Sequence, residues 1–573
     1  MTRLLPHVNR KQLALAAAGV LCAALSAPAP GTAAQKKGAP GTTARTPAPS
    51  RAADRIRARD LRAYLEFLAA DELEGRDTPS RGLDTAALFL ATQLKLWGLK
   101  PAGDEGSYFQ QIQLRRSRLD PARCTAALGS QVLRYGADFA ATTPGFPPTP
   151  RPGTAEGPLV YVGPGWMARA KKMDPYAGQD VKGKILLIQS GGSGLPRGLA
   201  AADLNGEKGV DWDDPQGSAL RLGAAGIVWL PRLATLANWE QNAALATRIS
   251  TVVEKFSPAG EAVPQITASA ALMQSLFRGE KLSADEVFAQ GAAGGAAESF
   301  ALTPSKVLKF TVALSVEKLL TRNVVAVLEG SDPKLRGEYV ALGAHYDHVG
   351  MREGMEGDRI FNGADDDGSG TAALLAMAET WARGVRPKRS LLFIWHAGEE
   401  KGLWGSRYFV ENPTVPLDKI IAQLNIDMIG RSKPAGDTNP RNANLSGPDQ
   451  IYVIGSRMMS DELAAVSEQV NSSYLKLEFD YRYDDPKDPN RFFFRSDHIN
   501  YARKGIPIIF YFDGVHEDYH RVTDHADRID YRKLERVTRT ICATATALGD
   551  APQRPKVVRT LPPELQARPR PGR

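Results

Sequence analysis

The sequence contains little cysteine. Of its 573 residues only 3 are cysteines, and Cys22 lies inside an apolar stretch near the N-terminus, where lipid attachment is a less favoured alternative. Cys124 and Cys542 remain. Two cysteines so far apart exclude a small fold held together by several disulfides, and the sequence leaves open whether these two form a bridge.

Long apolar runs are also scarce. The N-terminal apolar run, residues 13–25, is shorter than the about 20 residues that a membrane-spanning helix needs. It follows three basic residues and precedes small residues and prolines, which is the order of regions in a secretory signal peptide. We therefore predict a signal peptide over residues 1–34 and an exported protein, periplasmic or extracellular, without a stable membrane span. An uncleaved anchor is the alternative.

The chain lacks a concentrated excess of charge. Its formal net charge is +8, and the excess basic residues fall largely near the two ends, which gives no support for a nucleic-acid partner. Hydrophobic residues make up 43% of the sequence, which excludes a wholly disordered, collagen-like or multi-span membrane protein. A chain of this length is expected to form about three domains.

Apolar residues at helical spacing mark the N-terminal part of the folded chain. Between residues 55 and 113 they recur at steps of three and four, as in the stripe over residues 83–97. We predict a helical N-terminal part of the main domain over residues 55–122. The segments 35–54 and 551–573 are rich in Pro, Ala, Gly and basic residues, and are predicted to be a flexible leader and a disordered basic tail.

Residues 123–300 have a different pattern, with short β-type runs separated by Gly and Pro. The clearest runs are residues 157–163, 184–190 and 225–230. This stretch contains no histidine cluster, paired carboxylates or nucleophile arrangement. It is therefore predicted to be a separate, strand-rich insert.

Apolar strands alternate with helical segments over residues 301–550. This alternation predicts an α/β fold with a mostly parallel, doubly wound sheet flanked by helices. In such sheets ligands bind outside the carboxyl ends of the strands. The predicted strands are 323–328, 339–344, 391–395, 420–426, 451–454 and 507–512, and the main predicted helices are 371–382, 461–471 and 531–548.

Histidine and acidic residues gather where those strands end or helices begin. The motifs are HYDH (345–348), NGADDDGSG (362–370), HAGEE (396–400), NIDM (425–428) and EDYHR (517–521). Most of these motifs alone would be ordinary polar segments, but Asp427 lies inside an apolar run, where a buried Asp needs a partner. Three consecutive Asp residues do not fit the alternating acids of an EF-hand calcium loop. Together they predict one cleft with many carboxylates, which a cation would neutralise.

Zinc is the metal that this mixture of side chains favours. Zinc binds histidine nitrogens and carboxylate oxygens, and two zinc ions about 3.5–4 Å apart need a bridging carboxylate. The adjacent pair Glu399 and Glu400 would let one carboxylate bind metal while the other transfers a proton.

Six motifs, in this order, resemble those of the two-zinc exopeptidase family that includes bacterial leucyl aminopeptidase, aminopeptidase Y and, more distantly, glutamate carboxypeptidase: GAHYDHVG, NGADDDGSG, HAGEEKGLWGS, LNIDMIGR, RSDHINYARKGIP and EDYHRVTDHAD. The resemblance covers about residues 55–119 and 307–548. It implies the zinc exopeptidase (phosphorylase/hydrolase-like) fold. The insert resembles a protease-associated domain through VKGKILLIQSG and GAAGIVWL.

The resemblance implies two zinc ions as cofactors and a set of five ligands: His345, Asp366, Glu400, Asp427 and His520. Asp366 would bridge the two ions. His345 and Asp427 would complete one zinc site, and Glu400 and His520 would complete the other.

The same resemblance implies roles for the neighbouring residues. Glu399 would be the general base that acts on the attacking water, and Asp347 would orient the ring of His345. The family also has a cis peptide after the bridging Asp, here between Asp366 and Asp367. The implied activity is that of a secreted aminopeptidase, which acts on peptides with a free N-terminus.

The sequence departs from the family pattern at Phe493. Relatives can have a tyrosine there that stabilises the oxyanion, so either another donor such as Tyr511 or Tyr519 replaces it or the site differs from the family pattern. His516 and His525 flank His520 and are the alternatives to it as the last ligand. Four residues near the motifs are predicted to have structural or supporting roles: His348, His396, Asp497 and His498.

Three other functions compete with an aminopeptidase. A glutaminyl-cyclase-like acyltransferase would use a single zinc. A carboxypeptidase would hold a substrate carboxylate with Arg431 or Arg495. A non-catalytic, receptor-like relative is less favoured, because the ligand set is complete. The sequence gives neither the preferred substrate residue nor the oligomeric state.

Overall fold

The computed structural model describes residues 50–142, 150–190, 195–257, 262–293 and 298–562. The predicted signal peptide, nearly all of the predicted leader and the end of the predicted tail lie outside these ranges. Among the helices of the described ranges, none is both long and apolar enough to cross a membrane.

One ten-stranded sheet carries the strands that were predicted from residue 301 onward. Its order is β11-β2-β15-β19-β16-β20-β23-β21-β22, and β1 also pairs with β15. The strands are β1 (Lys100–Pro101), β2 (Phe109–Leu119), β11 (Ser250–Val253), β15 (Leu314–Leu328), β16 (Tyr339–His345), β19 (Ser390–His396), β20 (Ile420–Ile426), β21 (Gln450–Ile454), β22 (Glu478–Asp480) and β23 (Ile508–Phe512). All six predicted strands are confirmed.

The sheet is mixed, so the prediction of a mostly parallel sheet holds only at its centre. β19, β16, β20 and β23 are parallel neighbours. On one side, β15, β2 and β11 pair antiparallel, and on the other side β21 runs antiparallel to β23. The sequence pattern revealed buried strands but not the direction of those at the flanks.

The predicted helical N-terminal part contains a strand as well. α2 (Ala58–Leu68) and α3 (Arg81–Leu96) bury the predicted apolar stripes. Phe109–Leu119, however, forms β2. Its buried residues Gln110, Ile112 and Leu114 alternate with less buried ones, which is the period of a strand facing a core on one side. The helical prediction was therefore wrong for this segment.

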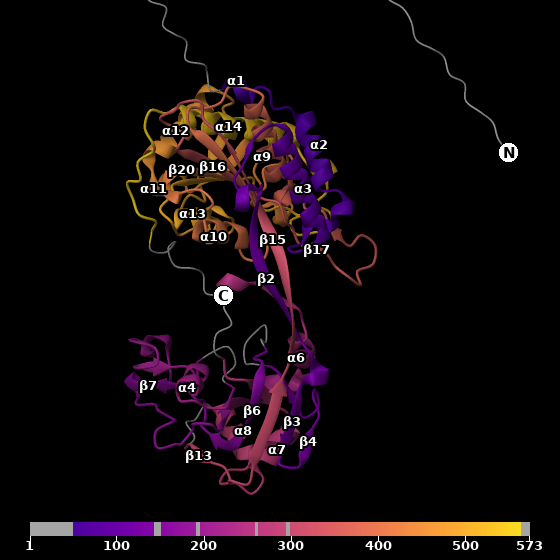
Figure 1. The fold of residues 1–573 in the computed structure, drawn as a ribbon, viewed down its shortest axis with the longest axis vertical. Helices are drawn as coiled ribbons and strands as arrows, with labels where there is room; N and C mark the ends of the chain where they lie inside the picture. Colours follow the sequence, from indigo (N-terminus) through magenta and orange to yellow (C-terminus); the bar gives the residue numbers. More distant parts are fainter. Residues whose placement is uncertain (1–49, 143–149, 191–194, 258–261, 294–297, 563–573) are drawn as a thin grey trace, which may run out of the picture. The chain divides into compact units, whose positions relative to one another are not determined.

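Helices cover both faces of the first sheet (Figure 1). Leu342 of β16 lies in a core with α2, α3, α9 (Gly370–Ala382), α12 (Asp461–Ser473) and α14 (Tyr531–Asp550). Its neighbour Ala341 lies in a second core with α10 (Trp404–Glu411) and α13 (His498–Ala502). Because successive side chains of a strand point to opposite faces, a doubly covered strand is apolar throughout. The three main predicted helices are confirmed as α9, α12 and α14.

A second, nine-stranded sheet is formed by the segment between β2 and β15. Its order is β4-β3-β14-β6-β8-β10-β12-β5, with β13 paired to β6. The strands are β3 (Thr125–Leu128), β4 (Gln131–Leu133), β5 (Phe139–Ala140), β6 (Gly153–Tyr161), β8 (Ile185–Gln189), β10 (Gly226–Leu230), β12 (Gln265–Ala268), β13 (Phe300–Ala301) and β14 (Val307–Val312). The three clearest predicted runs are confirmed as β6, β8 and β10, while the protease-associated resemblance stays a prediction.

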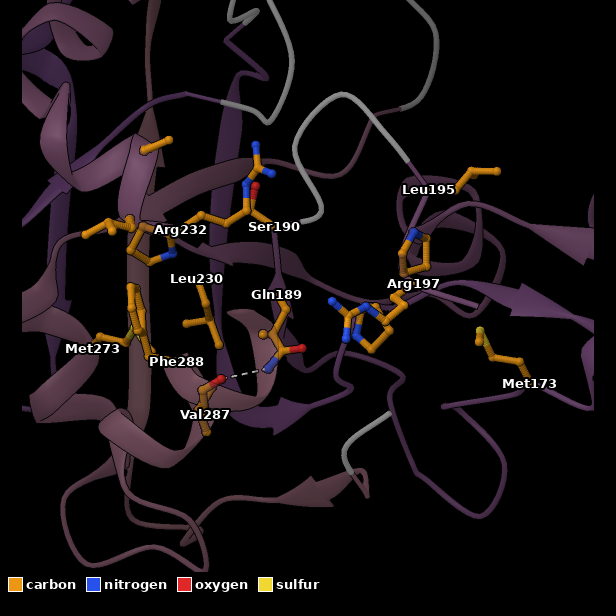
Figure 2. Close-up of a pocket in the computed structure, with 16 residues that line it drawn as sticks. Met173, Gln189, Ser190, Leu195, Arg197, Leu230, Arg232, Met273, Val287 and Phe288 are labelled. Atoms are coloured by element: carbon orange, nitrogen blue, oxygen red, sulfur yellow. Dashed lines mark hydrogen bonds between the residues drawn. The ribbon is translucent and has the colours of Figure 1, made fainter. Parts of the chain in front are cut away.

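The second sheet has its own apolar core and a cavity of about 420 Å³. The cavity lies where β8 and β10 end, at Gln189 and Leu230 (Figure 2). Gln189 donates a hydrogen bond of 2.9 Å to the carbonyl oxygen of Val287, and Arg197 and Arg232 also line the cavity. None of the predicted site residues lies there.

Residues 551–562, which follow α14, form no helix or strand. They contact residues of the domain that contains the first sheet. Arg554 pairs with Glu338, and Arg559 pairs with Asp461 at the start of α12. Leu561 is buried in the second core of the first sheet.

Candidate metal centre

The predicted ligands come together at the carboxyl ends of the parallel strands. His345 is the last residue of β16, Asp427 follows β20, and Glu399 and Glu400 follow β19 by a few residues. β19 and β20 lie on opposite sides of β16, so the three strand ends meet at one edge. Asp366 arrives from the segment that precedes α9, and His520 from the loop after β23.

A first group of donor atoms surrounds His345. Its Nε2 atom lies 3.2 Å from Oδ1 of Asp366 and 3.5 Å from Oδ1 of Asp427. All three side chains are buried, and their donor atoms lie within 4.8 Å of one another. Oε2 of Glu399 lies 4.0 Å from the same His345 nitrogen, so Glu399 is beside this group.

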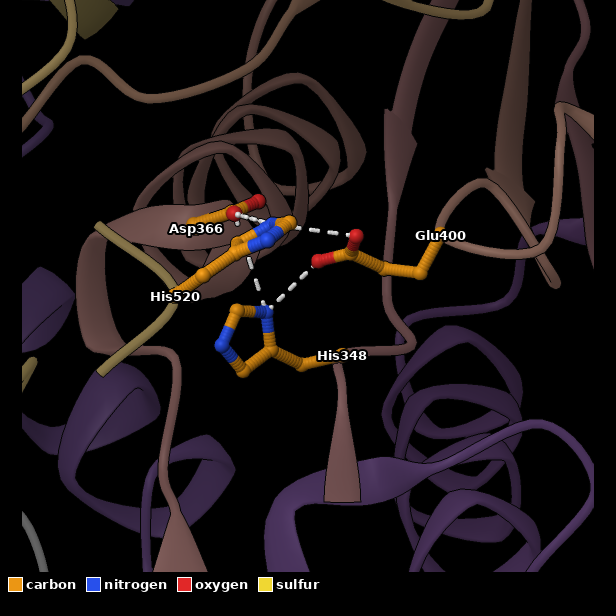
Figure 3. Close-up of side chains that lie close together, drawn as sticks. All are labelled: His348, Asp366, Glu400 and His520. Carbon is orange, nitrogen blue, oxygen red and sulfur yellow. Dashed lines mark ion pairs between the residues drawn. The ribbon is translucent and has the colours of Figure 1, made fainter. Parts of the chain in front are cut away.

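A second group surrounds Glu400 (Figure 3). Nε2 of His520 lies 3.1 Å from Oδ2 of Asp366 and 3.0 Å from Oε2 of Glu400. Asp366 thus faces the first group with Oδ1 and the second with Oδ2, which is the arrangement expected of a bridging carboxylate. The peptide bond between Asp366 and Asp367 is cis, as the resemblance implies.

His348 also belongs to the second group, which sequence reasoning missed. Its Nδ1 atom lies 2.9 Å from Oε1 of Glu400 and 3.7 Å from Oδ2 of Asp366. The sequence predicted a supporting or solvent position for His348, and the complete burial of its side chain contradicts the solvent position. The only available signal was its spacing, three residues after His345 at a strand end.

Both groups fit a metal ion. Among the described residues, Nε2 of His520, Oε1 of Glu400 and both ring nitrogens of His348 are buried without a hydrogen-bond partner. Buried polar atoms without partners are costly, and a cation between them would supply the missing interaction. Imidazole nitrogens and carboxylate oxygens are donors that zinc accepts.

The electrostatics of the centre also favour a cation. Burial, together with the nearby charges of Glu400 and Asp427, raises the pKa of Glu399 well above its usual range, although His345 opposes the shift. Burial likewise raises the pKa of Asp427. For Asp366 burial acts in the same direction, but its histidine neighbours outweigh it and hold the pKa well below its usual range. A bound cation would stabilise all three carboxylates in their ionised form.

The acids on either side of Asp366 hold the centre together. Oδ2 of Asp367 accepts a hydrogen bond from the backbone N–H of His345, and Oδ1 accepts from the backbone N–H of Gly370 and Met428. One carboxylate therefore joins β16, the start of α9 and the end of β20. The three-acid motif thus places one carboxylate among the donors and uses its neighbours for support.

Asp365 anchors the other side of the same segment. Its Oδ1 accepts a hydrogen bond from the backbone N–H of Gly430, and its Oδ2 lies 3.2 Å from Nε2 of His516. The carboxylate of Asp524 accepts from the backbone N–H groups of Asp365 and Asp366. His516 is consequently a supporting residue rather than a donor of either group.

Asp347 contacts both His345 and the segment of Glu399. Nδ1 of His345 lies 3.2 Å from the backbone oxygen of Asp347 and 3.7 Å from its Oδ1. Oδ1 accepts a hydrogen bond from the backbone N–H of Glu399, and Oδ2 accepts one from the hydroxyl of Thr78. The orientation of His345 therefore comes from the backbone oxygen as well as from the predicted carboxylate.

The structure separates the two candidate tyrosines. Tyr519 stacks on His520 at 4.0 Å and lines the pocket beside the first donor group. Tyr511 instead lies in the core on the other face of the first sheet, the one that contains Leu342. There its hydroxyl is 3.3 Å from that of Ser467. Phe493 is buried and packs against His498. Only Tyr519 of the two candidates is thus placed to contact a substrate.

The remaining candidates lie outside both donor groups. His396 is buried between Asp497, 3.2 Å away, and the hydroxyl of Tyr501, 2.9 Å away. His525 is partly exposed and lies 3.4 Å from Asp358. Of the three histidines around position 520, the structure brings only His520 to the centre.

A narrow pocket opens beside the first donor group. Its walls beyond the donors are mostly apolar, with one exposed arginine: Met428, Phe492, Arg495, Phe510, Phe512, Val515 and Tyr519. Arg495 donates a hydrogen bond of 3.3 Å to the hydroxyl of Tyr519. Arg431, the other arginine considered for a substrate carboxylate, is buried and paired with Asp518 at 2.7 Å.

The part of the chain that carries this centre is similar to known peptidases. Residues 323–545 match the family model of peptidase family M28. A probable zinc metalloprotease of Leptosphaeria maculans is 30% identical over 266 residues, which cover 41% of this chain and 59% of that protein. An aminopeptidase of Pseudomonas aeruginosa is 32% identical over 218 residues, which cover 37% of this chain and 35% of that protein.

Among solved structures, an aminopeptidase from Aneurinibacillus sp. strain AM-1 aligns with 90% of this chain and 98% of that chain, at 18% identity and a TM-score of 0.45. The chain spans about half of the length of the curated relatives that it matches. Every candidate donor lies within the segment that the family model matches.

Proposed function

We propose that this protein is an exported zinc-dependent exopeptidase, because residues 323–545 match the model of peptidase family M28. More specifically, we propose an aminopeptidase that removes the N-terminal residue of a peptide with the help of two zinc ions. The observation that carries this proposal is the position of Asp366, whose two oxygens face two separate groups of donors.

The residues present can hold two metal ions. His345, Asp366 and Asp427 would hold one, and Asp366, Glu400 and His520 would hold the other. Zinc in these positions supplies a Lewis acid for the scissile carbonyl and lowers the pKa of a bound water. A single-zinc acyltransferase would use only one of the two groups.

Glu399 has the position of a general base. Its side chain is partly buried beside the first group, and it is not itself a member of either group. It accepts a proton from the attacking water and returns it to the leaving amine. The hydrogen bond from its backbone N–H to Asp347 fixes the segment that presents it.

Tyr519 stabilises the oxyanion in this proposal. Burial and the nearby carboxylates raise the pKa of its hydroxyl far above the usual value, so the group keeps its proton at neutral pH. A protonated phenol that faces the reacting carbonyl can donate a hydrogen bond to the oxygen as negative charge develops.

The pocket supports a substrate with an apolar first residue. Phe492, Phe510 and Phe512 present aromatic rings to the space beside the donors. The free ammonium of such a substrate would lie near carboxylates, which attract it. Arg495 favours a second candidate, because an exposed arginine at this pocket could instead hold the C-terminal carboxylate of a peptide.

A panel of free and N-acetylated peptides distinguishes an aminopeptidase from a carboxypeptidase and from an acyltransferase. An aminopeptidase releases the first residue of free peptides, leaves N-acetylated peptides intact and loses activity with a zinc chelator. Release of the last residue from N-acetylated peptides would instead identify a carboxypeptidase. Cyclisation of N-terminal glutamine without hydrolysis, with one zinc per chain, would identify the acyltransferase.

A further inference from the structure

His348 has no role in the five-ligand set, yet it lies inside the second donor group. Its side chain is completely buried, with Nδ1 2.9 Å from Oε1 of Glu400. This contact lacks hydrogen-bond geometry, because both atoms are without a hydrogen-bond partner among the described residues. The two atoms instead form a close ion-pair contact beside Asp366 and His520 (Figure 3).

The position of the His348 ring is fixed from several sides. Its backbone N–H donates to the carbonyl oxygen of Arg76, which is itself buried. The ring packs so closely on Gly363 that a Cβ atom at that glycine would lie 2.5 Å from the ring. Its edge meets the ring of His520 at a centroid distance of 5.5 Å. A ring held in this way is preorganised toward the donors that it faces.

We propose that His348 is a further zinc ligand, which joins Asp366, Glu400 and His520 in a four-residue site. This assignment rests on the proposed zinc-dependent function. Donor atoms of these four residues lie within 4.8 Å of one another, and they offer two imidazole nitrogens and two carboxylate oxygens. Four protein ligands complete a tetrahedral zinc site.

The two metal positions are therefore unequal. The group of His345, Asp366 and Asp427 offers three protein ligands. A zinc site with three protein ligands keeps a position for water or substrate, whereas a site with four is closed. Glu399 lies beside the three-ligand group, where a proton acceptor is needed. The four-ligand site is the tighter one and holds Asp366 in place for the other.

Zinc affinity tests this assignment through a matched pair of variants. His348→Asn removes the proposed ligand, and His525→Asn makes the same change at a partly exposed histidine outside both groups. Competition with a zinc chelator is expected to show two classes of site in the wild-type chain. In His348→Asn the zinc affinity of the tighter class of site falls by about 10-fold or more. In His525→Asn the zinc affinities of both classes match those of the wild type.

Zinc X-ray absorption of the wild-type chain provides a readout that needs no variant. With His348 bound, three imidazoles over two zinc ions give about 1.5 per zinc, whereas the five-ligand set gives about 1.0. A value of about 1.0, or a His348→Asn variant that keeps the tight class within about twofold, would overturn the assignment. A wild-type chain that binds no zinc at all would overturn the proposed function as well, so the two failures are distinguishable.

Discussion

The backbone N–H of Glu399 donates a hydrogen bond to Oδ1 of Asp347, 3.1 Å away. This contact joins the segments that follow β16 and β19. The residue two positions after His345 thereby fixes the segment that presents the proposed general base. Since Asp347 is completely buried, its carboxylate has no route to solvent and must be satisfied by these contacts.

Asp347→Asn is expected to lower kcat/KM by about 10–100-fold, because partners behind metal ligands contribute in this range. The amide preserves the shape of the side chain but replaces one accepting oxygen with a donor. Steady-state kinetics and zinc content measure the effect. Asp180→Asn, at an exposed pair in the second sheet's segment, serves as the control. An Asp347→Asn enzyme with wild-type kinetics would contradict a positioning role.

The two adjacent glutamates are expected to respond differently to the same substitution. Glu399→Gln should keep both zinc ions and lose about 100-fold or more in kcat, because the amide cannot accept the proton. Glu400→Gln should lose zinc, since this carboxylate contacts both His348 and His520. Zinc analysis beside single-turnover kinetics separates the two outcomes. Normal turnover by a zinc-loaded Glu399→Gln enzyme would contradict the general-base assignment.

Tyrosine substitutions test which phenol faces the reaction. Tyr519→Phe is expected to lower kcat by about 100-fold or more, because it removes a donor to the developing oxyanion. Tyr511→Phe is the matched control, since its hydroxyl contacts Ser467 in the opposite core. Equal effects of the two variants on kcat would show that neither hydroxyl acts on the substrate.

Zinc affinity is expected to rise with pH. Although burial lowers it, the carboxylates of Asp366 and Glu400 raise the pKa of His520 to about 10 in the zinc-free protein. Zinc must displace that proton, so binding releases protons and weakens as the solution becomes more acidic. Calorimetric titration with zinc in buffers of different ionisation enthalpy measures the released protons.

His520 is also expected to make the free energy of unfolding of the zinc-free protein fall as the pH rises, whereas zinc affinity rises with pH. A pKa raised above the unfolded value of about 6.5 stabilises the fold fully below that pH. The contribution is lost as the pH rises through about 10. Thermal unfolding between pH 6 and pH 10 should therefore show a growing difference between zinc-loaded and zinc-free protein. A difference that shrinks with pH would contradict this account.

The sequence predicted the strand ends well, because strands covered on both faces are apolar throughout and end abruptly at polar motifs. β16 runs from Tyr339 to His345, and its carboxyl end is where the centre lies. β2 was missed because its flanking charged residues obscure the alternation of Ile112 and Leu114. The directions of the outer strands depend on long connections, which local pattern does not determine.

The limits of prediction at the site have a similar cause. The order of the motifs was enough to place Asp366 among the donors. It did not reveal that the carboxylate of Asp367 accepts hydrogen bonds from three backbone N–H groups in three parts of the fold. His348 looked like an ordinary neighbour of His345, because its contact with Glu400 exists only after β16 and β19 pair. Contacts between side chains from different elements follow from packing, which residue spacing alone does not give.

The most direct test of the account is anomalous diffraction at the zinc edge from crystals of the zinc-loaded chain. The account predicts two zinc peaks about 3.5–4 Å apart, one on each side of the Asp366 carboxylate. A single peak, or peaks that do not contact Asp366, would contradict the claim that this carboxylate joins two metal sites.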